Sequence, residues 1–217
     1  MTDQPTKTGR GCLFYGGIAA TVLILLIIAG AIVGLRQAKK MLGDFTDSAP
    51  RALPTVDVSP EQTAELRKRV ENFRNDVRAA RSPAPLSLSA DEINKLIATD
   101  PDLAPLKGTL YVAAIEGDHI KVQISAPLDQ LGLPIFRGRY LNGDGTFTIS
   151  LRGGLLYLKA LEIFVRGKPI PENYMQVIHG QNLAKPLNEN PRVSVALDKL
   201  KSIELKDGKL VIIPASP

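Results

Sequence analysis

The chain has 217 residues, a net charge of +5, a single cysteine and no tryptophan. One cysteine excludes an intramolecular disulfide, so the fold must rest on a packed core. The positive charge does not indicate a nucleic-acid partner, because most of it lies in the first 51 residues and no basic motif interleaved with aromatic residues is present.

Residues 11–35 form a continuous stretch without a charged side chain, rich in Leu, Ile, Val and Ala. As a helix it would span roughly 37 Å, enough to cross a hydrocarbon core about 30 Å thick. The stretch is longer than the apolar core of a signal peptide, which favours an uncleaved signal anchor after a short tail, residues 1–10. Ala29-Gly30-Ala31 resembles a cleavage site, so a cleaved and secreted form is the alternative.

Basic residues lie on both sides of this segment, so the positive-inside rule gives only a weak signal about its orientation. A short tail followed by the folded mass is typical of an exported, anchored domain. We therefore expect a cytoplasmic N-terminus and an extracytoplasmic C-terminal domain at the cell membrane. Gly30 and Gly34 form a G-x-x-x-G pair, which predicts a contact between two membrane helices in a homo-oligomer.

Residues 36–58 are of mixed polarity and contain Gly43, Pro50 and Pro54, which predicts an extended linker. Residues 59–81 then predict an amphipathic helix, with Ser59 as its cap and Gln62 completing a capping box. The linker would hold the following domain away from the bilayer.

The predicted 59–81 helix has one apolar stripe and one basic face. The stripe would pack on the domain or on a partner helix, and the basic face would contact anionic lipid or remain solvated. The residues of the candidate partner-helix face are Leu66, Val70, Phe73 and Val77.

Residues 82–217 predict one α+β domain, in which a curved, mainly antiparallel sheet packs on amphipathic helices. Ser89 and Glu92 form a capping box that starts a second helix, and alternating apolar residues then predict a series of hairpins. We expect turns at Asn142-Gly143-Asp144-Gly145, at Gly153-Gly154 and at Asp207-Gly208.

The apolar alternation changes phase after Ala160, which predicts a bulge or bend in that strand. A curved sheet of this kind would either enclose an apolar ligand or be filled by its own helices. The candidate ligand-facing residues are Phe147, Ile149, Leu151, Leu156, Leu158, Ile163 and Val165.

The sequence offers no pattern that indicates catalysis. Two histidines and one cysteine do not supply a zinc ligand set, and we expect no metal or other cofactor. No nucleophile elbow, phosphate-binding glycine loop or H-E-x-x-H motif occurs. We therefore expect a protein that is not an enzyme.

Three short motifs occur in a familiar order: LSLSADEIN at 86–94, GGLLYL at 153–158 and VRGKPIP at 165–171. The arrangement resembles bacterial single-pass, membrane-anchored proteins whose extracytoplasmic domains are related to tubular lipid-binding (TULIP-like) folds, including YpmS-like proteins. The resemblance implies a long, strongly curved antiparallel sheet around a helix, outside the cytoplasmic membrane, holding an acyl chain. It supplies no catalytic residues.

These features together predict a membrane-anchored envelope protein that binds lipid or another apolar ligand without catalysis. The alternative is a non-enzymatic scaffold or protein-interaction module that works through the 59–81 helix or a sheet edge. The expected partners are the lipid bilayer, an apolar ligand, and a second copy or another envelope protein, with no nucleic acid.

Overall fold

The computed structural model describes residues 43–81, 83–131 and 134–215. The chain divides into two compact units, Met1–Asp44 and Phe45–Pro217. The predicted tail, the predicted membrane segment 11–35 and its Gly30–Gly34 pair lie outside the described residues. Among the helices of the described ranges, none is long and apolar enough to cross a membrane.

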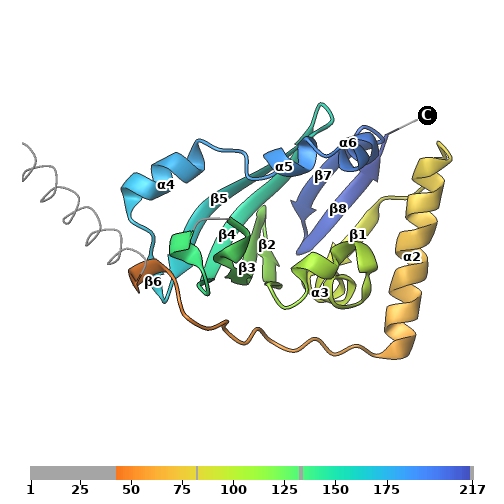
Figure 1. Cartoon of the computed structure of the whole chain (residues 1–217). Coiled ribbons are helices and arrows are strands. Elements are labelled where there is room, and N and C mark those ends of the chain that lie inside the picture. The colour runs from red at the N-terminus through yellow and green to blue at the C-terminus, as the bar shows by residue number, and fades with distance from the viewer. Residues whose placement is uncertain (1–42, 82, 132–133, 216–217) are drawn as a thin grey trace, which may run out of the picture. The chain divides into compact units, whose positions relative to one another are not determined.

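The second unit contains two antiparallel sheets and several helices (Figure 1). The predicted α+β class is therefore confirmed, but the strands form two sheets and not the one sheet that was predicted. The larger sheet has the order β2 (Leu110–Glu116), β3 (His119–Pro127), β4 (Tyr140–Arg152), β5 (Leu155–Val165) and β6 (Lys168–Pro169). The smaller sheet has the order β1 (Leu86–Ser89), β8 (Lys209–Pro214) and β7 (Leu200–Lys206).

In chain order the helices lie before and between the strands. They are α2 (Pro60–Arg78), α3 (Ala90–Thr99), α4 (Glu172–His179), α5 (Lys185–Asn188) and α6 (Pro191–Leu197), with short 3-10 helices at η1 (Pro101–Leu106), η2 (Leu128–Leu131) and η3 (Pro134–Phe136).

The two predicted capping boxes have different outcomes. At α3 the box is present, because the Glu92 amide donates to Ser89 Oγ at 3.2 Å and the Ser89 amide donates to Glu92 Oε2 at 2.8 Å. At α2 the prediction is wrong: Ser59 is the N-cap residue but its side chain makes no capping hydrogen bond. Gln62 instead accepts a hydrogen bond from Lys95 at 2.9 Å, so contact with α3 takes the side chain that would have completed the box.

Strand β4 corrects one predicted turn. The segment Asn142-Gly143-Asp144-Gly145 is not a turn but the interior of β4, where Gly143 pairs with Ile124 of β3 and with Val165 of β5. The glycines are required by close packing, since a Cβ on Gly143 would lie 2.7 Å from the Phe164 carbonyl oxygen. The prediction of a turn here was therefore wrong, because it depended on the glycines alone.

The predicted bend in β5 is confirmed by the pairing register. Thr146 pairs with Glu162, whereas the next residue, Phe147, pairs with Ala160. Leu161 is thus the extra residue of a β-bulge, which increases the local twist and bends the β4–β5 ladder. The predicted reversals at Gly153-Gly154 and Asp207-Gly208 also occur, and all four residues have positive φ.

Strand β1 was not predicted as a strand. Its four residues pair with β8, and Leu86 and Leu88 point into the same apolar cluster as the stripe of α2. The sequence at this point alternates leucine and serine over only four residues, which is too short for a periodic pattern to identify a strand.

Candidate functional site

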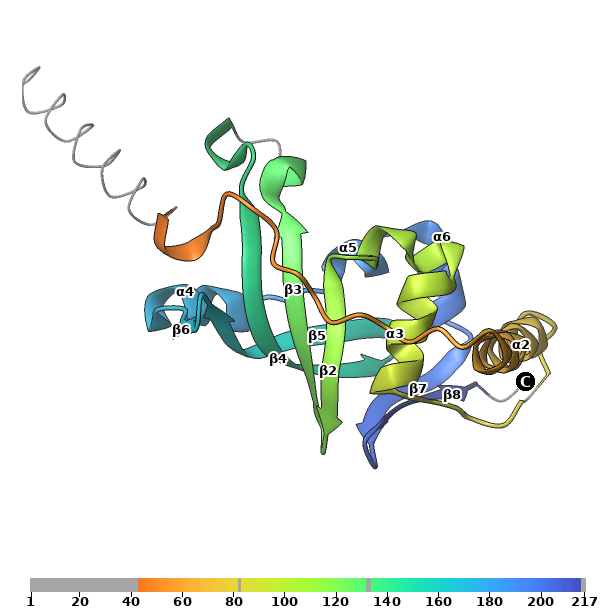
Figure 2. The ribbon, with the colours of Figure 1, turned by 90° about the horizontal axis from the view of Figure 1, so that it is seen from below.

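The most unusual polar contacts of the domain hold its first residues, 45–51, against strands β3 and β4. We call residues 45–51 the arm. Asp47 and Tyr140 exchange two backbone hydrogen bonds of 2.8 Å, so the arm forms an antiparallel bridge at the start of β4. Figure 2 shows the chain crossing the larger sheet before it reaches α2. Within the predicted 36–58 linker, residues 45–51 are therefore bound to the domain.

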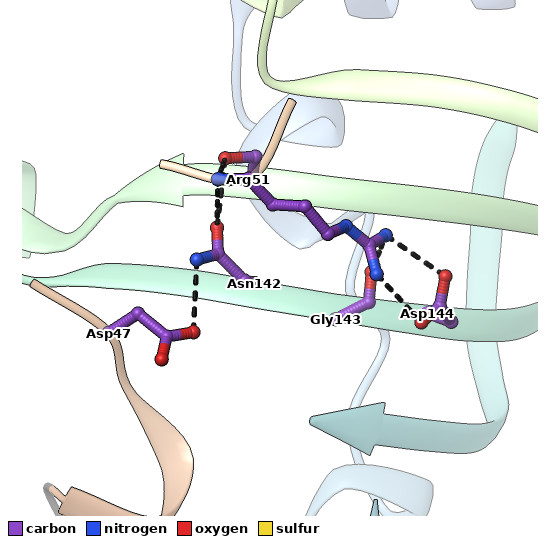
Figure 3. Close-up of polar contacts among 6 residues, drawn as sticks. Asp47, Arg51, Asn142, Gly143 and Asp144 are labelled. Atoms are coloured by element: carbon purple, nitrogen blue, oxygen red, sulfur yellow. Dashed lines mark hydrogen bonds and ion pairs between the residues drawn. The ribbon is translucent and has the colours of Figure 1, made fainter. Parts of the chain in front are cut away.

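Asn142 lies at the centre of these contacts and uses all four of its hydrogen-bonding positions (Figure 3). Its Oδ1 accepts from the Arg51 amide at 3.0 Å and from Ser125 Oγ at 2.9 Å. Its Nδ2 donates to Asp47 Oδ2 and to the Ala49 carbonyl, both at 2.9 Å. Asn142 is 8% exposed and Ser125 2% exposed, so this is a buried network that specifies where the arm binds.

Arg51 closes the network from the other side. Its two terminal nitrogens donate to the two carboxylate oxygens of Asp144 at 3.0 Å each, and Nη2 also donates to the Gly143 carbonyl at 3.0 Å. The hydrogen bonds from this guanidinium to Asp144 raise the pKa of Arg51, against the opposing effect of burial. Because both side chains remain partly exposed, the ion pair contributes about 1 kcal/mol or less to the free energy of unfolding.

Two further arginines hold the first half of the arm. Arg139 donates from Nε to Thr46 Oγ1 and from Nη2 to the Thr46 carbonyl, both at 2.8 Å. Arg166 lies 3.5 Å from the Asp47 carboxylate. Together with Asn142, these residues fix both ends of the arm.

The described hydrogen bonds and ion pairs that hold the arm are joined by little burial of its side chains. Of the described residues 43–59, Thr46 alone is buried, and it is polar. Apolar burial is the main source of stability in the rest of the domain. The arm is therefore attached by different forces from the fold that it contacts.

The seven candidate ligand-facing residues lie in the core of the domain. Phe147, Leu151, Leu156 and Val165 are buried, while Ile149, Leu158 and Ile163 are partly buried against the same clusters. Side chains of α4, α6 and β7 pack in these clusters. Two described cavities, of about 330 and 400 Å³, lie beside α2, and neither is lined by any of these seven residues.

The candidate partner-helix face is covered by the chain itself. Leu66, Val70 and Phe73 are buried and Val77 is partly buried, in a cluster that includes residues of β1 and α3. This corresponds to the alternative in which the helix packs on its own domain.

The basic face of α2 also makes contacts within the chain, since Arg69 pairs with Glu92 at 2.6 Å and Arg74 with Asp100 at 2.9 Å. Burial would raise the pKa of Glu92, but hydrogen bonds from Ser89 and Arg69 more than offset this effect and lower it.

Side chains cover the sheet edges at several points. On β2, Asn94 accepts from the Val112 amide and donates to its carbonyl, both at 2.8 Å. On β5, Asn188 bonds the amide and the carbonyl of Leu156 in the same way, while Asn182 donates to the Leu156 carbonyl and accepts from the Leu158 amide. Such contacts protect an edge from pairing with another strand.

Exposed apolar residues concentrate in one stretch of the chain. Among the described residues, eight large apolar side chains are exposed, and six of them belong to β5 or to the helical crossover α4–α6. Val177 and Val195 are the most exposed, at 61% and 60%. We call these six residues the crossover surface: Leu155, Leu161, Tyr174, Val177, Leu187 and Val195.

No cluster of three or more His, Cys, Asp or Glu residues suited to a metal ion occurs in the ranges that the structure describes. Comparisons of the chain with protein-family models, with curated proteins and with solved structures found no match. The TULIP-like resemblance therefore stays an expectation from sequence.

The sequence analysis did not predict the arm site, although the spacing of its residues on β4 carried a signal. Asn142 and Asp144 alternate with two glycines in a stretch that continues directly into the alternating strand pattern of 146–151. Polar side chains at alternate positions of a strand point to one face. That spacing was the available signal that a polar segment would bind there.

Proposed function

We propose that this protein is a single-pass membrane protein whose C-terminal domain is a non-enzymatic, extracytoplasmic interaction module. The observation that carries the proposal is the docked arm. Only residues 36–44 separate it from the end of the predicted membrane segment.

An interaction module accords with the surfaces of the domain better than a ligand carrier does. The candidate ligand-facing side chains of the sheet pack in the core of the domain, and the described cavities beside α2 are lined by charged as well as apolar residues. The crossover surface, in contrast, leaves apolar side chains exposed. Apolar side chains that are exposed to solvent can form protein contact sites.

The proposal is tested by co-purification of the full chain from membranes after crosslinking. Val177→Asp, on the crossover surface, should abolish recovery of a specific partner. Val58→Asp is the matched control, since Val58 is also exposed but lies outside that surface. Equal recovery of every partner from the two variants and the wild type would contradict the proposal.

The competing function is binding of a lipid or another apolar ligand. Native mass spectrometry of the full chain released from membranes distinguishes the two. We expect the bare mass of the chain. A stoichiometric lipid that remains bound to the wild type but is lost on Leu158→Asp would favour the ligand carrier instead.

A further inference from the structure

We propose that two copies of this chain exchange their arms, so that the arm of each copy binds the arm site of the other. The arm site is the surface of β3 and β4 that holds residues 45–51, with Ser125, Tyr140, Asn142 and Asp144 as its main contacts. The partner is thus a second copy of this chain. The inference goes beyond the proposed function, because it uses neither the crossover surface nor the membrane anchor.

The arm site binds the arm as an extended peptide, through the peptide backbone as well as a side chain. Asp47 exchanges two backbone hydrogen bonds with Tyr140. Asn142 accepts from the Arg51 amide and donates to the Ala49 carbonyl. The Arg51 side chain adds an ion pair. Sheets bind extended peptides from other chains by the same combination of contacts, and the arm of a second copy carries the same residues.

The arm lies outside the apolar core, so it can leave while the domain stays folded. Among the described residues, those of the three apolar clusters include none from the arm. Helix α2, which follows the arm, is held separately by Leu66, Val70 and Phe73. Segments with few buried apolar contacts open locally at a lower free-energy cost than the global fold.

Residues 52–58 join the arm to α2, and we call them the hinge. Figure 1 shows the hinge as a run without helix or strand. Its residues are all described, none of them is buried, and none forms a hydrogen bond or an ion pair within the described chain. Seven residues reach about 25 Å at most, which allows the hinge to cross to a neighbouring copy. Exchange would redirect the hinge without breaking any polar contact of its own.

The arm makes the same contacts in the exchanged dimer as in a single copy, so the density of copies decides between the two forms. A short flexible linker gives its attached segment an effective concentration on the order of millimolar. Pro54 restricts the hinge, which limits the conformations that return the arm to its own domain. Exchange of an identical segment is a low-cost route to a dimer, and its extent should rise with the density of copies.

Disulfide crosslinking between two differently tagged copies of the full chain tests the exchange. Both copies carry Cys12→Ser and are produced together in one membrane. One copy carries Asp47→Cys and the other carries Tyr140→Cys. The two positions form a bridge of hydrogen-bonded antiparallel strands, in which Cα atoms lie about 5.5 Å apart, within disulfide range. After mild oxidation we expect a covalent dimer with both tags, because position 47 of one copy reaches position 140 of the other only through an exchanged arm.

Three control variants show whether the crosslink reports binding at the arm site. Lys201→Cys in place of Asp47→Cys measures random collision, since Lys201 is exposed and lies on β7, outside the arm. Asn142→Ala, added to the copy with Tyr140→Cys, removes the bonds that Asn142 forms with the arm and should lower the yield of dimer at least about fivefold. A chain that carries both Asp47→Cys and Tyr140→Cys should form the disulfide, within one copy or between two.

Three results would overturn the exchange. A yield of tagged dimer no higher than that of the Lys201→Cys control would mean that each arm stays on its own copy. A yield that Asn142→Ala does not lower would mean that the crosslink forms without binding at the arm site. The absence of a disulfide in the chain with both substitutions would mean that the arm does not dock. None of these results affects the Val177→Asp comparison, so failure of the exchange and failure of the proposed function are distinguishable.

Discussion

The central position of Asn142 leads to a quantitative prediction for Asn142→Ala. The substitution removes four hydrogen bonds of 2.9–3.0 Å, which would total about 2–6 kcal/mol at 0.5–1.5 kcal/mol each. The full sum should not be observed, because the arm can detach and let Arg51 and Asp47 bond with water. We expect a loss of about 2–3 kcal/mol in the free energy of unfolding, limited by the free energy that holds the arm.

Because the free energy that holds the arm limits the loss, a double variant tests the prediction. If Asn142→Ala already releases the arm, adding Arg51→Ala should cost little more, and the two effects should be clearly less than additive. Urea unfolding of the full chain in detergent micelles, followed by circular dichroism, measures each variant. Asn173→Ala is the matched control on the exposed surface of α4 and should change stability by less than about 0.5 kcal/mol. Additive losses, or an Asn142→Ala effect no larger than that of the control, would refute the account.

Three further predictions concern the fold that supports the arm. Gly143→Ala should destabilise the domain by about 1–3 kcal/mol in the same unfolding assay, because the new Cβ would press on the Phe164 carbonyl, and a neutral effect would contradict the packing argument. Asn94→Ala should cost about 2–4 kcal/mol by leaving the backbone amide and carbonyl of Val112 without partners, and wild-type stability would show that water replaces the side chain. The lowered pKa of Glu92 contributes stability that is present above about pH 4.5 and lost as the pH falls through the folded pKa. Glu92→Gln should therefore flatten the acid limb of the stability profile, and a profile with the wild-type slope would count against this ion pair.

Much of the fold could be predicted from local sequence signals. The Ser89 capping box, the Asp207-Gly208 turn and the phase change at Ala160 each depend on residues close together in the chain, and each occurs in the structure. Local signals succeed where the nearest neighbours decide the conformation. The missing cap at Ser59 shows the converse, since Gln62 is engaged by Lys95 from a different helix.

The arm site could not be predicted in this way, because its partners are far apart in sequence. Arg51 and Asp144 are separated by 93 positions, and the glycine beside Asp144 is needed for packing against a third strand. A turn and a docking strand use the same residue types, Asn, Asp and Gly, for different reasons. Only the tertiary pairing of β4 on both sides distinguishes them.

The claim that the arm is docked is tested most directly by a distance measurement within the full chain. Spin labels at Ser48 of the arm and Lys159 of β5, both exposed positions, would be introduced after replacing Cys12 by serine. The account predicts a single narrow distance distribution in lipid nanodiscs for the wild-type arm, which broadens when Arg51→Ala is added. A broad distribution in the wild type would contradict it.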